Sequence, residues 1–325
     1  MQPPEFWHRP AGLFSALLTP FGALYAFGTA WRLSRGTPSK IDVPVVCVGN
    51  INAGGTGKTP TVIALVQRLQ SMGKTPHVVS RGYGGTLKVA TRVNERHHKA
   101  EDVGDEPMLL AAFAPTWIGA DRFEGAKLAV AEGADVIILD DGFQNPKLHK
   151  DVSLVVVDAA RGFGNGKVLP AGPLREPVEK GLKRADMLLS IGPAKAQRHF
   201  AETWGVPPCP HLKGRLQPLQ TGMDWQGARV LAFAGIGHPQ KFFATVKELG
   251  ADVVKSEALE DHQPLSTALM TRLESEAAVL GAQLVTTEKD ATRLPDDFRA
   301  KVLTVPVRLD IEDWSALDAA LTKLF

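Results

Sequence analysis

The sequence has few cysteines and no excess of charge of either sign. Its 325 residues include two cysteines, Cys47 and Cys209, which are too few for a disulfide framework and lack zinc-site spacing. A reducing, cytoplasmic environment is therefore expected. The formal net charge is +2, from 37 basic and 35 acidic side chains, so overall charge does not indicate a nucleic-acid partner. The length suffices for about two domains, each with its own core.

Charge is also missing from one long segment near the amino terminus. Residues 11–31, AGLFSALLTPFGALYAFGTAW, contain no charged side chain, whereas Arg9, Arg32 and Arg35 flank them. This length approaches the roughly 20 residues that a helix needs to cross a bilayer. The basic flanks and Trp31 are typical of a membrane interface.

Four interpretations of this segment compete. A cleaved signal peptide is disfavoured because the apolar stretch is long and no convincing small-residue cleavage site follows. A spanning helix is weakened by Pro20 and by three glycines within residues 11–31. A bent helix or a helix pair that lies in the membrane surface fits better. The remaining alternative is a helix buried in the protein core.

A glycine-rich segment carries the first motif with clear chemistry. Residues 52–59, NAGGTGKT, nearly match the phosphate-binding loop G-x-x-x-x-G-K-[ST], in which backbone N–H groups and a helix N-terminus surround phosphates. Asn52 replaces the first glycine and is expected to act through its backbone, because asparagine enters left-handed conformations readily. The residues expected to bind a nucleotide are Asn52, Ala53, Gly54, Gly55, Thr56, Gly57, Lys58 and Thr59.

The surroundings of this loop support a nucleotide site. Upstream, residues 43–48 form a β-branched run that is typical of a buried parallel strand. Downstream, Pro60 suits the first turn of a helix, and apolar residues follow with helical spacing. Strand, glycine loop and helix is the arrangement that the motif requires; a plain glycine-rich turn is the alternative.

A second apolar run ends in two carboxylates. Residues 136–139 are followed by Asp140 and Asp141, which predicts a strand that places a carboxylate at the carboxyl edge of a parallel sheet. From there a carboxylate can reach a magnesium ion held by the phosphate-binding loop. Strands often end in aspartate, so the prediction depends on the pairing with residues 52–59.

Strand and helix patterns alternate through the rest of the chain, which predicts an α/β protein with parallel sheets in two lobes. Residues 161–177 form a long loop rich in glycine and proline, a type of loop that is often functional. Residues 205–220, with four prolines, are expected to be a linker, and residues 302–307 a strand. The expected division is a membrane-associating helical segment (1–36), a nucleotide-binding domain (37–215) and a smaller C-terminal α/β lobe (216–325).

Several protein classes use such a loop. A GTPase needs Asn/Thr-Lys-x-Asp, and residues 287–290, TEKD, have the wrong spacing. A dimeric partitioning ATPase needs lysine where Ala53 stands. An ATP-dependent transferase is therefore favoured. A membrane-associated ATPase switch that acts on a protein partner and a soluble small-molecule kinase are the alternatives.

Six blocks of sequence together resemble the tetraacyldisaccharide 4'-kinase family, collinearly over roughly residues 5–295. They are VGNINAGGTGKTP, SRGYGG, VGDEP, DDGFQ, GFGNGKVLPAGPLREP and TEKDA. The resemblance implies a P-loop kinase with two α/β lobes at the cytoplasmic face of the bacterial inner membrane. It further implies ATP and Mg²⁺, and transfer of the γ-phosphate to the 4'-hydroxyl of an acylated glucosamine disaccharide 1-phosphate, giving lipid IVA. Neither a nucleic acid nor an obligate protein partner is expected.

Roles follow from the motif and the resemblance. Lys58 is expected to bridge the outer phosphates, and Asp140 and Asp141 to serve the metal or the lysine. Arg175 resembles a family active-site position that neutralises charge on the transferred oxygens, although an exposed loop ion pair is the alternative. Gln144 is a weaker candidate near the phosphates. The expected metal ligands are Thr59, Asp141 and Glu176.

The hydroxyl that accepts the phosphoryl group must lose its proton, and a carboxylate can take it. The resemblance supports Asp105 as this base and His262, from the second lobe, as a residue that orients or tunes it. A helix cap is the alternative role for Asp105. An exposed loop histidine is the alternative for His262.

Overall fold

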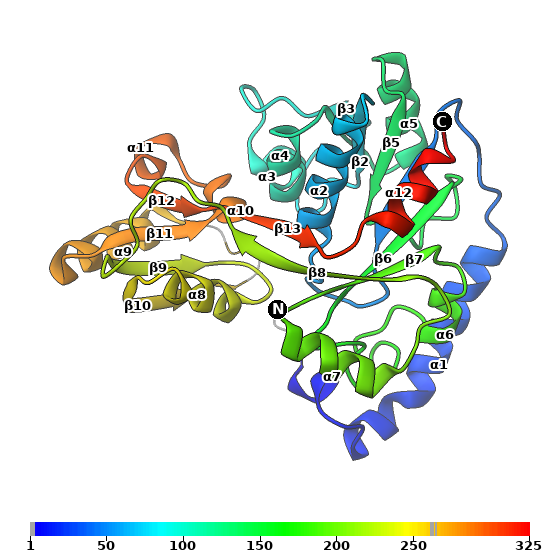
Figure 1. Ribbon diagram of the computed structural model, residues 1–325, viewed down its shortest axis with the longest axis horizontal. Coiled ribbons are helices and arrows are strands. Elements are labelled where there is room, and N and C mark those ends of the chain that lie inside the picture. Colours follow the sequence, from blue (N-terminus) through cyan, green and yellow to red (C-terminus); the bar gives the residue numbers. More distant parts are fainter. Residues whose placement is uncertain (1–3, 261–262, 264) are drawn as a thin grey trace.

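The structure is a computed structural model that describes residues 4–260, 263 and 265–325. It contains a large α/β unit, a smaller α/β unit beside it, and an N-terminal helix on the large unit (Figure 1). The N-terminal elements are η1 (Glu5–His8) and α1 (Leu13–Ser34). His262 and Asp261 lie outside the described residues.

The large unit is built on one mixed sheet that, within the described residues, has nine strands in the order β13-β8-β7-β6-β1-β5-β2-β4-β3. The pairs from β8 to β4 are parallel, and β13 and β3 are antiparallel edge strands. The strands are β1 (Val45–Gly49), β2 (Pro76–Ser80), β3 (Thr91–Arg92), β4 (Thr116–Ile118), β5 (Val136–Asp140), β6 (Val152–Asp158), β7 (Met187–Ile191), β8 (His211–Pro218) and β13 (Val307–Ile311). The helices are α2 (Lys58–Ser71), α3 (Ala100–Val103), α4 (Asp105–Ala111), α5 (Arg122–Ala131), α6 (Val178–Leu182), α7 (Ala194–Trp204) and α12 (Ser315–Thr322).

Helices cover both faces of this sheet, so its central strands are buried on both sides. Leu65 of α2 and Leu317 of α12 belong to the apolar cluster on one face. Ala126 of α5 and Phe200 of α7 belong to the cluster on the other face. All five residues of β1 are buried, which explains why its sequence is a continuous apolar run rather than an alternating one.

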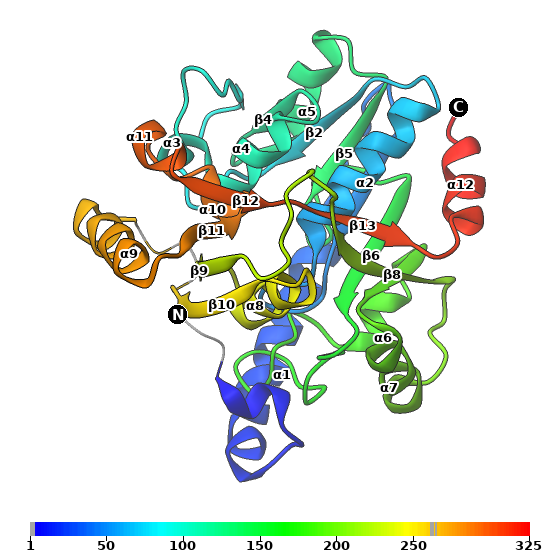
Figure 2. The ribbon, with the colours of Figure 1, turned by 60° about the vertical axis from the view of Figure 1, so that its left-hand side comes forward.

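The smaller unit has a parallel sheet in the order β10-β9-β11-β12. Its strands are β9 (Arg229–Ala234), β10 (Asp252–Ala258), β11 (Gln283–Thr287) and β12 (Val302–Val305), and its helices are α8 (Pro239–Glu248), α9 (Thr267–Leu280), α10 (Glu288–Ala291) and α11 (Asp296–Arg299). Figure 2 shows that the chain passes from β12 of this unit directly into β13 of the large sheet.

Two segments differ from the sequence-based expectation. Residues 205–220, expected to be a linker, contain β8, which pairs with β7 and β13. Residues 302–307, expected to be one strand, are divided at Pro306 between β12 and β13 in different sheets. Proline has no N–H to donate to a strand ladder, which suits it to this crossing point. The last strand and α12 thus pack on the large unit, although the expected division assigned them to the C-terminal lobe.

The uncharged N-terminal segment forms one helix, α1, rather than a helix pair, and Pro20 lies inside it. Its buried residues are the small side chains of Ser15, Gly22 and Thr29, spaced by seven. A Cβ on Gly22 would lie 2.8 Å from Val168 O, so glycine permits this close approach to the large unit. Large apolar side chains cover the outer face of the helix: Leu13, Phe14, Leu17, Phe21, Leu24, Tyr25, Phe27 and Trp31 are all exposed.

In the part of the chain that the structure describes, α1 is the one helix long and apolar enough to cross a membrane. That property rests on its length and composition. Because the apolar face is exposed, the interpretation of residues 11–31 as a buried core helix is wrong.

Candidate active site

The phosphate-binding loop connects β1 to α2 as the motif predicts. Gly54 and Gly57 have φ values of 107° and 97°, in the left-handed region that favours glycine, and Gly57 is the N-cap of α2. Lys58 and Thr59 occupy the first turn of that helix. The free N–H groups of the turn and the positive end of the helix dipole therefore face the loop, as an anion site requires.

The loop is anchored by its neighbours. The Asn52 side chain is buried and donates from Nδ2 to Gly162 O at 3.1 Å, so its role is not limited to its backbone. The Ala53 N–H donates to Pro173 O at 2.6 Å. These bonds join the loop to residues 161–177, the long glycine- and proline-rich loop.

Asn50 holds the loop from inside, a role that sequence reasoning missed. Its side chain is fully buried and donates from Nδ2 to Thr56 Oγ1 at 3.1 Å and to Gly54 O at 3.3 Å. The only signal was its place directly after the first strand, which is common for a turn residue.

Asp141 brings two cations to the start of α2. Its carboxylate lies 3.6 Å from Lys58 Nζ and 3.1 Å from Arg175 Nη1. Its φ of 49° is unusual for a residue other than glycine and turns the chain sharply after β5. Burial raises the pKa of this carboxyl, but Lys58 and Arg175 together outweigh burial and hold it below the ordinary value. Asp141 therefore remains ionised near neutral pH and fixes both cations.

Gln144 and Glu176 form a second layer behind this cluster. Gln144 Nε2 donates to Asn50 O at 2.9 Å and to Glu176 Oε1 at 3.0 Å, and its Oε1 accepts from Arg175 at 3.3 Å. Both oxygens of Glu176 accept from Arg184 Nη2 at 2.7 Å. Glu176 is buried, and its contacts indicate a part in holding Gln144, which in turn contacts Arg175; the metal role of Glu176 stays a prediction.

Asp140 lies at the end of β5, opposite Val48 of β1, and is 1% exposed. Ser80 Oγ donates to its Oδ2 at 2.9 Å. Its Oδ1 is buried and accepts no hydrogen bond within the described residues. Burial, then the charges of Glu106 and Asp141, raise the pKa of Asp140 to about 7. A carboxylate oxygen left without a donor beside a phosphate-binding loop fits a cation.

The raised pKa of Asp140 predicts a dependence of stability on pH in the protein without nucleotide or metal. The unfolded chain releases this proton near the ordinary value of 3.8, whereas the folded chain retains it up to about 7. The contribution of Asp140 to folding thus becomes less favourable as pH rises from about 4 to 7. Asp140→Asn removes the ionisation, so we expect its melting temperature relative to wild type to rise over this interval. Thermal unfolding of both proteins in EDTA at pH 5, 6, 7 and 8 checks this. A constant difference between their melting temperatures across these pH values would contradict it.

Asp105 begins α4 and is 3% exposed. Its Oδ1 accepts from the adjacent Glu106 N–H at 3.0 Å, but the N-cap of α4 is Gly104 and no side chain makes a capping hydrogen bond there, so the alternative role of Asp105 as a helix cap is wrong. Its Oδ2 lies 3.8 Å from Lys289 Nζ and 3.9 Å from Arg293 Nε, and both cations come from the smaller unit. Lys289 also contacts Glu106, at 3.2 Å.

Arg293 is held in place by a buried carboxylate, another contact that sequence reasoning missed. Asp290 is fully buried, forms a salt bridge with Arg293, and accepts from Gly235 N at 3.0 Å and Thr287 Oγ1 at 2.7 Å. Arg293 Nε itself is buried without a hydrogen-bond partner within the described residues. This unpaired N–H belongs to the side chain that faces Asp105.

The smaller unit also reaches the phosphate-binding loop. A Cβ on Gly237, in the turn after β9, would lie 3.6 Å from Gly55 N. Lys241 of α8 forms a salt bridge of 2.5 Å with Asp158 at the end of β6. The smaller unit thus meets the large unit at the phosphate-binding loop, at Asp158 and at Asp105.

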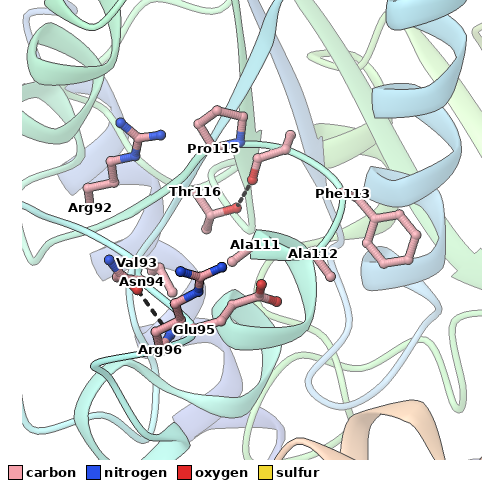
Figure 3. A pocket seen from close by; sticks show the side chains of 11 residues that line it. Arg92, Val93, Asn94, Glu95, Arg96, Ala111, Ala112, Phe113, Pro115 and Thr116 are labelled. Carbon is pink, nitrogen blue, oxygen red and sulfur yellow. Dashed lines mark hydrogen bonds between the residues drawn. The ribbon is translucent and has the colours of Figure 1, made fainter.

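A cavity of about 660 Å³ lies away from the phosphate-binding loop (Figure 3). Its lining includes Arg92, Arg96 and Phe113, and Thr116 at the amino end of β4. In a parallel sheet this is the edge opposite to the carboxyl ends that carry residues 52–59. It is therefore separate from the candidate active site.

A glycine loop between β1 and α2, with a lysine that contacts the aspartate after the neighbouring strand β5, places this chain among the P-loop nucleotide-binding proteins. The family model described as Tetraacyldisaccharide-1-P 4'-kinase matches residues 14–325, and the chain belongs to this family. Tetraacyldisaccharide 4'-kinase of Jannaschia sp. (strain CCS1) is 62% identical over 325 residues, covering 100% of this chain and 99% of the relative. That of Dinoroseobacter shibae is 59% identical, covering 100% and 98%.

A solved structure agrees with the fold. The crystal structure of LpxK from Aquifex aeolicus in complex with ATP matches with a TM-score of 0.78 and 27% sequence identity, covering 96% of this chain and 100% of that one. The sequence-based predictions of the family, the α/β fold and the kinase activity are confirmed. The roles of individual site residues stay predictions.

Proposed function

We propose that this enzyme transfers the γ-phosphate of ATP to the 4'-hydroxyl of a tetraacyldisaccharide 1-phosphate, giving lipid IVA. The observation that carries the proposal is the Lys58–Asp141–Arg175 cluster at the start of α2. The relatives named above and the ATP complex of the Aquifex aeolicus protein support it. In the reaction the hydroxyl oxygen bonds to the γ-phosphorus, the bond to the β-phosphate oxygen breaks, and ADP leaves.

Residues 52–59 would bind the phosphates through backbone N–H groups, as in other P-loop enzymes. Lys58 would contact the β- and γ-phosphates, and Asp141 holds its ammonium group at the helix start. Arg175, fixed by Asp141 and Gln144, would face the oxygens of the transferring group. A pre-positioned guanidinium stabilises charge that develops in the transition state without moving during the reaction.

Asp105 would accept the proton of the attacking hydroxyl. Its Oδ1 accepts from the Glu106 N–H, and its Oδ2 lies beside the two cations of the smaller unit, so Oδ2 would be the oxygen that takes the proton. Lys289 and Arg293 favour the ionised carboxylate, which is the form that a general base needs. Both cations come from the smaller unit. We infer that packing of the smaller unit against α4 places them beside Asp105 and thereby prepares it to act as the base. The part of His262 stays a prediction.

The residues present fit a magnesium ion. Thr59 supplies a hydroxyl in the first turn of α2, and Asp140 supplies the buried Oδ1 without a donor. We propose that Asp140 faces the metal while Asp141 serves Lys58 and Arg175. When bound, the ion would neutralise charge on the phosphates. Ser80 holds the Asp140 carboxylate in a fixed orientation.

We propose that α1 associates with the cytoplasmic face of the inner membrane, where an acylated acceptor lies. We expect the double substitution Leu17→Glu and Leu24→Glu, on its exposed face, to reduce co-sedimentation with lipid vesicles at least about tenfold, because each charge opposes burial in hydrocarbon by about 2–3 kcal/mol or more. Turnover of the acylated acceptor should fall with it. Val279→Glu, at an exposed apolar residue of α9, is the matched control. Unchanged sedimentation of the double variant would remove α1 from membrane binding.

The proposed activity is tested with labelled ATP and a panel of acylated and deacylated glucosamine disaccharides, followed by lipid extraction. Label in the acylated disaccharide fraction supports the proposal. The alternative, an ATPase switch that acts on a protein partner, predicts release of inorganic phosphate that proteins stimulate and lipids do not. Label that stays in the aqueous phase with every acceptor would contradict the kinase.

A further inference from the structure

A cavity of about 410 Å³ lies where the N-terminal segment meets the large unit. Its walls come from residues 8–11, the turn that follows β6, and α7. Such a volume is within the range of small-molecule sites, about 300–1,000 Å³. The side chains in its lining that can carry positive charge are His8, Arg9, Arg161 and His199.

Arg161 and His8 form a hydrogen bond in this cavity. Arg161 Nη1 donates to His8 Nε2 at 3.2 Å, so this nitrogen of the imidazole acts as the acceptor. The nearest acidic side chain on the same turn, Asp158, is taken by Lys241 at 2.5 Å, and within the described residues Arg161 has no salt bridge. Burial lowers the pKa of both His8 and Arg161, and the charge of Arg161 lowers that of His8 further; the charge of Asp158 opposes these effects in part. An anion between them would offset both effects.

Within the described residues, no carboxylate forms a salt bridge with Arg161 in this cavity. Arg9 pairs with Glu5 at 2.5 Å, but both side chains are mostly exposed, and such pairs hold a cation only weakly. His238 of the smaller unit is also close, and its pKa is lowered to about 4 by burial and by Arg161, so it is neutral there. Among the described residues, Arg161 is thus a guanidinium in this cavity that forms no salt bridge.

The cavity connects the membrane-facing helix to the nucleotide site. Pro10 and Ala11 line it directly before α1, whose outer face is apolar. Gly162, also in its lining, accepts the hydrogen bond from Asn52 of the phosphate-binding loop. A ligand here can therefore have acyl chains along α1 and a polar part that extends toward residues 52–59.

We propose that this cavity binds a lipid-borne phosphate group, with Arg161 as the main ligand and His8, Arg9 and His199 around it. The proposal rests on the proposed function for one of its two sources, the 1-phosphate of the acceptor. The other source is the phosphate of an anionic phospholipid beside α1. Both carry the same chemistry, and the two arms of the experiment separate them.

The first arm measures kinase kinetics in a non-ionic detergent without phospholipid. For Arg161→Gln we expect the KM for tetraacyldisaccharide 1-phosphate to rise about tenfold or more, the loss of one charge-assisted hydrogen bond, with kcat within about twofold of wild type. The same acceptor without its 1-phosphate should show no difference between variant and wild type. Arg198→Gln is the control, an exposed arginine of α7 outside the lining.

The second arm measures co-sedimentation with phosphatidylcholine vesicles, with and without phosphatidylglycerol. If the cavity takes a phospholipid, Arg161→Gln loses the extra binding that phosphatidylglycerol gives, whereas Arg198→Gln keeps it. His199→Gln, at an exposed lining residue, repeats both arms if Arg161→Gln does not fold, as judged by its melting transition.

Each outcome decides the proposal. A KM effect confined to the phosphorylated acceptor assigns the acceptor's 1-phosphate, and a vesicle effect alone assigns a phospholipid. Wild-type behaviour of the variants in both arms overturns the proposal. If the wild-type protein phosphorylates no acceptor, the proposed function fails, and the vesicle arm alone still decides whether the cavity binds a lipid phosphate.

Discussion

Lys58→Ala is expected to lower kcat for phosphoryl transfer by about 10²–10³-fold, because one preorganised donor aimed at the developing charge commonly contributes that much. The structure gives the reason: Lys58 lies in the first turn of α2, is only partly exposed, and is fixed 3.6 Å from Asp141. Steady-state kinetics at saturating ATP and acceptor measure the effect.

Two comparisons make this result specific to the site. Lys195→Ala removes an exposed lysine from α7 and should leave kcat unchanged within about twofold, as surface substitutions usually do. Lys58→Arg keeps the charge but changes the geometry, so it should restore little. Turnover of Lys58→Ala like that of wild type would remove the loop lysine from the mechanism.

Asp105→Asn is expected to lower kcat by about 10²–10⁴-fold, the range that general base catalysis commonly contributes. The amide oxygen can still accept the Glu106 N–H, so the start of α4 should persist and ATP affinity should not change. Asp102→Asn is the matched control, because Asp102 accepts the Lys99 N–H at the start of α3 and lies outside the proposed base. A small effect at Asp105, with unchanged ATP affinity, would leave it a structural residue at the start of α4 and direct the search for the base to Asp140 and Asp141.

The effect of Arg293, from the smaller unit, on Asp105 can be measured separately through the pH dependence of kcat. Arg293→Gln should raise the pKa on the acidic limb of the kcat–pH profile, because the ionised form of Asp105 loses a neighbouring cation. If the limb disappears in Asp105→Asn and moves in Arg293→Gln, the two residues act on the same proton. A lower kcat for Arg293→Gln with an unmoved limb would indicate a structural role through Asp290.

Much of the nucleotide side of the site could be predicted from the sequence. The motif at residues 52–59 and the strand that ends at Asp140 are local signals, and sheet geometry requires their ends to meet at one edge. The contact between Lys58 and Asp141 follows from that geometry. The cation pair on Asp105 does not, because Lys289 and Arg293 are distant in sequence and only the packing of two units brings them to it.

The errors in the fold also have physical causes. The prolines between residues 205 and 220 indicated a linker. Three of them precede β8 and the fourth is its last residue, so they do not interrupt this strand between β7 and β13, which is only partly buried. Gln144 was predicted near the phosphates and Glu176 as a metal ligand, and both roles stay predictions. The structure adds the hydrogen bonds of Gln144 to Arg175 and Glu176, and the sequence carries no sign of Arg184, which donates to both Glu176 oxygens.

The proposed reaction transfers the γ-phosphate to one hydroxyl of the acylated disaccharide. A single-turnover reaction tests it most directly, with enzyme in excess over γ-labelled ATP, purified tetraacyldisaccharide 1-phosphate in detergent, and ³¹P NMR of the extracted lipid. We expect one new phosphomonoester at the 4' position for each ATP consumed, and about 10²–10³-fold slower formation of it with Lys58→Ala. Stoichiometric ATP loss with the label in inorganic phosphate, or a phosphate at another position, would contradict it.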